Sequence, residues 1–210
     1  IFSHVYLGGT AEFSCAGGVS VACKSGYPWA GHIEYTLSPK TPAAFQFAVH
    51  VPAWCRKWQV QVNGQAVQPA LKDGYAYLAR EWKDGDTVTL ELEIKARRVY
   101  ANTRVRKDAG CVALVRGPIV YCFEEKENGK DLSALRIPRN AALEEKWVRD
   151  ETVGKLLEIQ LQGIRTASSD LLYDENPPQE TQTLVSAVPY YMWGNRGLGE
   201  MRVWMLESKP

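Results

Sequence analysis

Apolar and polar residues alternate with a period of two along much of this chain, and turn residues interrupt the alternation at short intervals. The alternation is clear at 45–51, 58–62 and 87–94, and Asn63-Gly64 directly follows the second of these runs. Successive side chains of a strand point to opposite faces, and Asn-Gly is a strong two-residue hairpin signal. Short strands joined by such turns predict a sandwich or jelly roll.

A second series of strand-like runs follows residue 100, at 111–115, 119–123, 156–161, 183–188 and 201–206. The chain has 210 residues, enough for two small β-domains with a core each. Helix formers occupy 141–147 after Asn140, but the segment is short and leads into a strand, so we expect it to be extended or a single turn. We predict an all-β fold of two consecutive antiparallel β-sandwich or jelly-roll units, residues 1–100 and 101–210.

The charge balance and hydropathy argue against two classes of partner. Lys and Arg total 25 against 24 Asp and Glu, which gives a formal net charge of +1. Such a chain offers no basic field for phosphate backbones or anionic lipid. No apolar run approaches the roughly 20 residues that a membrane helix needs. We therefore expect neither a nucleic acid nor a membrane as a partner.

The cysteines and the first residues bear on compartment and on chain length. The five cysteines form no C-x-x-C pair, and most lie in apolar strand-like segments: Cys15, Cys23, Cys55, Cys111 and Cys122. We interpret them as small buried hydrophobes, which favours a reducing, cytoplasmic compartment and leaves a periplasmic or secreted one open. The sequence begins Ile1-Phe2-Ser3 without Met or a leader, so we expect a segment of a longer polypeptide.

No arrangement of residues typical of catalysis emerges from the sequence. The three histidines lack metal-ligand spacing, and no G-x-S-x-G or phosphate-binding glycine motif is present. Acidic pairs occur at Glu124-Glu125, at Glu144-Glu145 and at Asp84 with Asp86. We expect the first pair to be a solvated strand end and the last to be hairpin chemistry. We therefore predict no catalytic residue in this chain.

The aromatic residues suggest where the chain makes contacts. Seven Trp and ten Tyr are many for this length, and β-sandwich modules use such rings to stack against sugars. The candidates for sugar or domain-interface contacts are Tyr27, Trp29, Trp54, Tyr191 and Trp193, together with Arg196. Filling of the cores is the competing interpretation of the rings. Arg196 is expected to pair with a carboxylate that the sequence does not identify.

Several motifs in a fixed order carry a family resemblance. They are Tyr27-Pro28-Trp29-Ala30-Gly31, Val51-Pro52-Ala53-Trp54-Cys55, Val62-Asn63-Gly64, Gly74-Tyr75, the run 80–86, the run 112–121 and the run 188–197. Each motif alone is weak, but the ordered series spans nearly the whole chain. It resembles the C-terminal half of glycoside hydrolase family 127, the β-L-arabinofuranosidase family, formerly a domain of unknown function.

The resemblance implies an enzyme whose active site lies in an N-terminal (α/α)6 barrel. In that family a zinc-bound cysteine thiolate is the nucleophile of a retaining hydrolase and a glutamate is the acid/base, which is sensible because a zinc-bound thiol is ionised at neutral pH. Those residues precede the region that this sequence matches, and no Cys-Cys pair is present here. We therefore expect no cofactor in this chain, and zinc only in the catalytic barrel.

Three functional hypotheses follow. The first is a non-catalytic region of a β-L-arabinofuranosidase-like enzyme that braces its own N-terminal catalytic barrel and mediates a homodimer. The second is a carbohydrate-binding module that recognises arabinose-containing glycans through exposed aromatic rings. The third is a self-contained hydrolase with an unrecognised carboxylate pair. Aromatic rings aligned on one strand face among polar neighbours favour the second hypothesis over the first.

Overall fold

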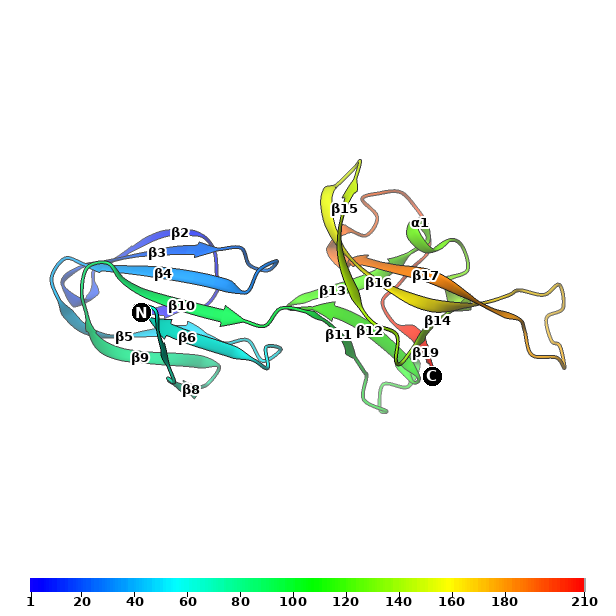
Figure 1. Ribbon diagram of the computed structural model, residues 1–210, viewed down its shortest axis with the longest axis horizontal. Coiled ribbons are helices and arrows are strands. Elements are labelled where there is room, and N and C mark those ends of the chain that lie inside the picture. The colour runs from blue at the N-terminus through cyan, green and yellow to red at the C-terminus, as the bar shows by residue number, and fades with distance from the viewer. Residues whose placement is uncertain (210) are drawn as a thin grey trace. The chain divides into compact units, whose positions relative to one another are not determined.

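The computed structural model describes residues 1–209 and confirms the all-β fold (Figure 1). The chain divides into two compact units, Ile1–Ile94 and Lys95 onward. The division precedes the position near residue 100 chosen from the sequence, because the strand Ala96–Val99 pairs with strand Cys111–Arg116 of the second unit. Within residues 1–209, no helix is both long and apolar enough to span a membrane.

The first unit has a four-stranded sheet in the order β1-β5-β9-β8 and a six-stranded sheet in the order β2-β3-β4-β10-β6-β7. Only β1 and β5 pair in parallel within these two sheets. The elements are β1 (Phe2–Ser3), β2 (Gly9–Phe13), η1 (Cys15–Gly17), β3 (Val19–Ser25), β4 (His32–Pro39), β5 (Ala43–His50), β6 (Trp58–Val62), β7 (Gln65–Val67), β8 (Ala70–Lys72), β9 (Tyr75–Trp82) and β10 (Asp86–Leu92).

The core of the first unit lies between its two sheets. Alternate residues of β4 and β10 are buried, as the period of two predicts. They join side chains from β5 and β9 in one apolar cluster. Tyr35 meets Phe47 edge to face at 5.2 Å across the cluster, and the buried Trp82 indole donates to the Phe45 carbonyl at 3.0 Å. The fully buried tryptophan therefore keeps its polar atom satisfied.

The Asn63-Gly64 hairpin has the geometry that its sequence predicts. Both residues have positive φ, 51° and 75°, which suits a tight turn between strands. The Asn63 side chain donates to Asp86 at 2.8 Å and accepts from the Thr87 amide at 2.8 Å. Asp86 in turn accepts from the Lys83 amide at 2.8 Å. One pair of side chains therefore fixes two neighbouring turns.

The second unit closes its sheet on itself. The strand order β12-β19-β14-β16-β17-β13 returns to its start because β13 also pairs with β12, which makes a six-stranded barrel. All neighbours in the barrel are antiparallel except β14 and β19. Strand β11 pairs with β12, β18 with β13 and β15 with β16. A closed barrel leaves no unpaired edge among its six strands.

The elements of the second unit are β11 (Ala96–Val99), η2 (Arg106–Asp108), β12 (Cys111–Arg116), β13 (Ile119–Glu124), α1 (Glu125–Asn128), η3 (Leu132–Ala134), β14 (Leu135–Pro138), β15 (Glu144–Asp150), β16 (Gly154–Thr166), β17 (Glu180–Pro189), η4 (Tyr190–Met192), β18 (Met201–Arg202) and β19 (Met205–Ser208). The segment 141–147 is extended, as expected, since β15 begins within it.

One predicted strand is wrong. We expected a single strand at 201–206, but the chain bends at Val203 and Trp204. Before the bend, β18 pairs with β13, and after it β19 pairs with β12 and β14. The alternation of side chains reports which residues face the core, but it does not report this change of partner strand.

Candidate functional site

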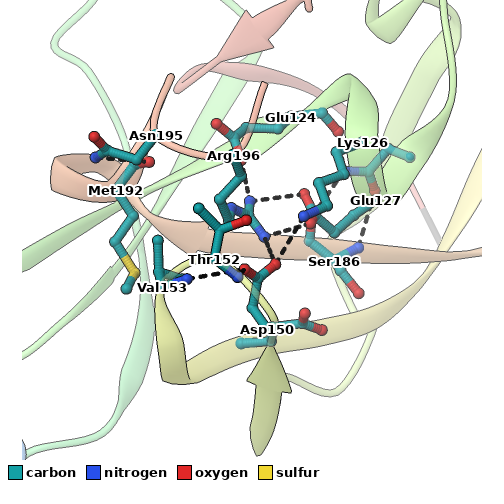
Figure 2. A network of polar contacts seen from close by, with 12 residues as sticks. Glu124, Lys126, Glu127, Asp150, Thr152, Val153, Ser186, Met192, Asn195 and Arg196 are labelled. Carbon is teal, nitrogen blue, oxygen red and sulfur yellow. Dashed lines mark hydrogen bonds and ion pairs between the residues drawn. The ribbon is translucent and has the colours of Figure 1, made fainter. Parts of the chain in front are cut away.

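Buried charged residues of the second unit gather around Arg196, at the end of the barrel where β13 ends (Figure 2). Strand β13 ends at Glu124, and the single-turn helix α1 that follows presents Glu127. Strand β15 ends at Asp150, and the loop after β17 delivers Arg196. Three segments that are distant in sequence therefore supply one charge cluster, which we call the Arg196 cluster.

The Arg196 guanidinium binds two carboxylates and lies close to a third. Its Nη1 and Nη2 donate to the two oxygens of Glu127 at 2.6 and 3.1 Å, and Nη2 also donates to Glu124. Its Nη1 lies 3.5 Å from Asp150 Oδ2. The two-point contact with Glu127 is the fork geometry in which arginine binds carboxylates most strongly.

Arg196 and the three acids around it are largely removed from water, whereas Lys126 is nearly half exposed. The side chains of Arg196 and Glu124 are only 2% and 8% exposed. The Lys126 ammonium donates to Asp150 Oδ2 at 2.8 Å, and Asp150 also accepts from the Thr152 and Val153 amides at 2.8 and 3.1 Å. Figure 2 shows the two cations between the three acids. Buried charges are tolerated when they are paired and hydrogen-bonded in this way.

The pKa shifts follow from these contacts. The hydrogen bond from Lys126 holds the pKa of Asp150 well below its usual range, and the two backbone donors add to the effect. Desolvation raises the pKa of Glu127, although Arg196 opposes the shift. Desolvation would lower the pKa of Arg196, but its bonds to Glu127 and Glu124 outweigh this and raise it. Arg196 is therefore a permanent charge.

The loop that carries Arg196 is anchored on both sides. Met192 is buried in a small apolar cluster with Cys122, Leu156 and Val188. The Met192 carbonyl accepts from the backbone and side-chain amides of Asn195, both at 3.2 Å. On the far side of Arg196, the Glu200 amide donates to Glu125 at 3.0 Å. The loop is thus fixed by the barrel wall and by helix α1.

A pocket of about 320 Å³ opens beside the cluster. Its wall is formed by Glu124, Glu125, Lys126, Trp193, Arg196, Gly197, Leu198 and Gly199. We call it the Trp193 pocket. Gly199 is packed against Glu125, because a methyl group at Gly199 would come within 3.1 Å of Glu125 Cβ. The pocket therefore combines one aromatic ring with charged groups held by the cluster.

The structure places the three candidates of the second unit differently. Trp193 lines the pocket and is 47% exposed, and its ring is nearly parallel to that of Tyr190, with centroids 6.3 Å apart. Tyr191 is exposed but does not line the pocket. Arg196 lines the pocket, but its side chain is committed to Glu124 and Glu127. Arg196 therefore holds the neighbouring acids and the loop in place, whereas the exposed ring of Trp193 is free to contact a ligand.

The candidates of the first unit are all partly buried. Tyr27 and Trp54 share a side-chain hydrogen bond and pack against the apolar core, and the Tyr27 ring meets Tyr6 edge to face at 4.8 Å. Burial raises the pKa of Tyr27. Trp29 is half-buried in the turn before β4, where its amide donates to Gly26. Tyr27 and Trp54 therefore come together within the first unit.

Two sequence interpretations need correction or addition. Glu124 was expected to be a solvated strand end with Glu125, but it is buried because Arg196 neutralises it. Glu127 and Asp150 were not selected at all. The need of a buried arginine for a carboxylate partner is a signal that the sequence provides. Nothing local in the sequence, however, connects Arg196 to Glu127 and Glu124, which lie 69 and 72 positions away. Only the tertiary pairing of strands reveals them.

The described residues offer no ready metal site. Among residues 1–209, no group of three or more His, Cys, Asp and Glu side chains is arranged to hold a metal ion. The carboxylates of the Arg196 cluster face Arg196 and Lys126, whose positive charges oppose a bound cation. The zinc implied by the family resemblance therefore does not fit the residues of this cluster.

Comparison with family models and with a curated relative gives a consistent result. The model described as "Beta-L-arabinofuranosidase, GH127 middle domain" matches residues 1–94. The model described as "Glycoside hydrolase family 127 C-terminal domain" matches residues 96–206. A non-reducing end beta-L-arabinofuranosidase of Bifidobacterium longum subsp. longum is 37% identical over 215 residues, which cover 97% of this chain and 32% of that protein. The chain thus spans about a third of the length of this relative.

Solved structures share the fold. A GH127 beta-L-arabinofuranosidase from Geobacillus stearothermophilus T6 matches with a TM-score of 0.94 and 38% identity over 99% of this chain and 33% of that chain. A structure described as a glycoside hydrolase matches with a TM-score of 0.88 and 30% identity over 99% of this chain and 36% of that chain. Both units are thus found in sequence order in larger proteins, and the chain belongs to glycoside hydrolase family 127, of which it carries the middle and C-terminal domains.

Proposed function

We propose that this chain is the non-catalytic β region of a β-L-arabinofuranosidase-like glycoside hydrolase, and that it braces a catalytic portion lying outside residues 1–210. One observation carries the proposal: the two matching models describe a middle and a C-terminal domain, and the chain spans only about a third of the curated relative. The remaining two-thirds of such a protein is long enough to hold a separate catalytic domain.

The state of the buried acids supports a structural role for the Arg196 cluster. A glycosidase needs one carboxyl that donates a proton and a second that attacks or activates water. Glu124 and Glu127 share Arg196, and Asp150 is bound by Lys126 and two amides. Acids held in this way have their oxygens occupied by cations and amide donors. The cluster therefore suits the fixing of a loop better than the cleavage of a glycosidic bond.

An apolar surface of the first unit supports the bracing role. Val5 and Leu7 are 63% and 77% exposed, and they rim an apolar hollow of about 400 Å³ that Phe47 and Tyr35 also line. Exposed apolar surface of this kind marks an interaction site. We assign the catalytic portion of the same polypeptide as its occupant, since the relatives carry about two-thirds of their length outside the matched region. Dimerisation is a further proposed role of the chain.

A chimera tests this proposal. The matching third of the Bifidobacterium longum enzyme is replaced by residues 1–210, and hydrolysis of p-nitrophenyl β-L-arabinofuranoside is compared among the chimera, the intact enzyme and residues 1–210 alone. We expect turnover by the chimera and the intact enzyme only. Turnover by residues 1–210 alone, abolished by a single Glu→Gln change, would show instead that the chain is a self-contained hydrolase.

The apolar hollow can be tested in the same chimera. Leu7→Asp places a charge on the proposed contact and should lower the activity or the thermal midpoint of the chimera, because a buried unpaired carboxylate is costly. Leu172→Asp is the matched control, since Leu172 is 94% exposed in the loop between β16 and β17. Equal effects of the two substitutions would remove the support that the hollow gives to the bracing role.

A further inference from the structure

We propose that the Trp193 pocket is a binding site for a neutral sugar. Exposed aromatic faces beside fixed hydrogen-bonding groups are the combination that holds a sugar ring, whose C–H face is apolar and whose rim carries hydroxyls. Trp193 provides the face, and Glu125 and Lys126 provide polar groups from the opposite segment of chain. The pocket volume of about 320 Å³ lies in the range of small-ligand sites.

A second aromatic ring, that of Tyr190, lies beside Trp193. The Tyr190 and Trp193 rings lie within 16° of parallel, and both are nearly half exposed. The Trp193 amide donates to the Tyr190 carbonyl at 3.0 Å, which closes the single 3-10 turn between them. This turn therefore keeps the two residues next to each other before any ligand arrives. Such preorganisation reduces the entropy lost on binding.

The polar wall retains groups that a hydroxyl can use. Glu125 Oε2 accepts from the Glu200 amide at 3.0 Å, whereas Oε1 has no hydrogen-bond partner among residues 1–209. Lys126 is nearly half exposed, and its ammonium has donors besides the one used by Asp150. Each hydroxyl of a sugar can donate to Glu125 and accept from Lys126. The wall thus offers one acceptor and one donor at fixed positions.

The charge of the pocket selects the class of sugar. Its wall contains two acids, Glu124 and Glu125, and two cations, Lys126 and Arg196, so its formal charges balance. Glu124 and Arg196 are already paired with each other. An anionic ligand would meet the carboxylate of Glu125, and a cationic ligand would lie beside the positive charges of Lys126 and Arg196. A neutral ring with several hydroxyls is the best fit.

This inference extends the proposed function, because a glycosidase that acts on a polymer gains from a second hold on its substrate. Sugar binding at the Trp193 pocket does not, however, depend on the bracing role. Loss of activity in the chimera would leave sugar binding by residues 1–210 intact, and a chain that binds no sugar could still brace a catalytic portion. The two proposals therefore fail separately.

Titrations of residues 1–210 followed by tryptophan fluorescence and by the indole N–H signals in NMR test the site. The probes are methyl β-L-arabinofuranoside and L-arabinose, with D-glucose, D-glucosamine and D-glucuronate to vary charge on one ring type. We expect saturable, millimolar binding of a neutral sugar that shifts the Trp193 signal. Glucosamine and glucuronate should bind more weakly than glucose.

Matched substitutions assign the site. Trp193→Ala should weaken binding at least about tenfold, as expected when one dominant contact is removed. Trp147→Ala is the control, because Trp147 is 45% exposed and does not line the pocket, and it should change affinity by less than about twofold. If Trp193→Ala unfolds the second unit, Glu125→Gln is used instead. The glutamine oxygen can still accept from the Glu200 amide, but an NH2 donor takes the place of the second carboxylate oxygen.

The outcomes are decisive in both directions. A neutral sugar that shifts the Trp193 signal and is lost in Trp193→Ala or Glu125→Gln establishes the site. No saturable binding by any neutral probe, equal losses in Trp193→Ala and Trp147→Ala, or tighter binding of a charged sugar than of glucose each overturns the proposal.

Discussion

In the first unit, the polar pair formed by Asn63 and Asp86 joins two neighbouring turns. Asn63 and Asp86 are 23 positions apart and lie at the surface, where two hairpins end. In the second unit, Arg196 and Glu124 are 72 positions apart and are buried. The first arrangement sets local geometry, whereas the second links segments from separate parts of the barrel. Loss of the polar pair in the first unit and loss of the buried ion pair in the second should therefore have different effects on stability.

The difference has an energetic basis. Exposed polar pairs contribute about 0–1 kcal/mol because water competes for both partners. Removal of one partner of a buried pair costs about 3–5 kcal/mol because the remaining charge stays desolvated and unpaired. Three acids would share the loss of Arg196. The second unit should therefore be far more sensitive to a single charge substitution than the first.

The largest effect is expected for Arg196→Met. This change keeps an unbranched side chain but removes the cation from Glu124 and Glu127, so the second unit should lose about 3–5 kcal/mol of unfolding free energy. Amide hydrogen exchange measures the loss of stability separately in each of the two units. Amides of β12, β13 and β17 should lose protection, while those of β3, β4 and β10 should keep it.

Arg202→Met is the matched control for that experiment. Arg202 is exposed on β18, close in sequence to Arg196, and its loss should change stability by less than about 0.5 kcal/mol. Comparable losses of protection in both units after Arg196→Met would mean that the cluster does not act on the second unit alone. The two units would then not differ in their sensitivity to the loss of this charge.

The next largest effect is expected for Gly31→Ala in the first unit. A Cβ at Gly31 would lie 1.8 Å from the Leu92 carbonyl oxygen, while the Leu92 amide donates to the Gly31 carbonyl at 2.9 Å. The end of β10 must therefore move, at a cost of about 2–3 kcal/mol in denaturant unfolding of the first unit.

Gly85→Ala separates crowding from backbone conformation. Gly85 has a φ of +81°, but nothing lies within 4 Å of its missing Cβ, so the change should cost about 1 kcal/mol. A Gly85→Ala loss as large as that of Gly31→Ala would show that turn geometry, and not close approach, limits the first unit. The stability of the first unit would then depend mainly on the local conformation of its turns.

The smallest effect is expected in the pH dependence of the free energy of unfolding. Because Lys126 and the two amides depress the pKa of Asp150, its contribution to stability is present above the usual Asp value of about 3.9 and is lost as the pH falls below that value. Asp150→Asn should therefore cost about 1–2 kcal/mol at pH 7, a modest value because Lys126 is nearly half exposed, and less towards pH 2.

The measurement is the free energy of unfolding of both proteins from pH 2 to pH 7. Glu127 has a raised pKa and so loses stability as the pH rises through its titration, but it is present in both proteins and cancels to first order in the difference. Asp170→Asn, at an exposed position in the loop after β16, is the control. A gap between the wild type and Asp150→Asn that stays constant with pH would contradict the assigned cause.

The sequence predicts elements well where a few adjacent residues decide the conformation. Asn63-Gly64 specifies its turn because both residues tolerate positive φ, and β6 (Trp58–Val62) has the bounds that its alternation indicates. Closure of the barrel rests on β12 with β13 and on the parallel pair β14 and β19. The first pairing has a local signature in the turn at Gly117-Pro118. The parallel pairing of β14 with β19 has none, and the bend at Val203 and Trp204 precedes it.

The same limit applies to the site. The need of Arg196 for an acid follows from chemistry, but which acid depends on a barrel that brings β13 and β15 beside the loop after β17. Glu124 looked solvated because its neighbours are charged, although it continues a strand whose preceding residues are buried. The sequence was enough to name Trp193 as a candidate contact residue. Its pocket could not be predicted, because the pocket forms only when the fold brings Glu125 and Gly199 next to Trp193.

The position of β19 in the barrel has a consequence for biosynthesis. This strand, Met205–Ser208, is one of the six that close the barrel, and it lies between β12 and β14, which are made much earlier. During translation the first unit can complete all its strands once Leu92 leaves the ribosome, but the second must wait with β12 and β14 unjoined until residue 208 is free. In a nascent chain of this family, β12 therefore waits for β19 while residues 117–208 are made, and β14 waits while residues 139–208 are made. This is the interval in which a chaperone would be most useful.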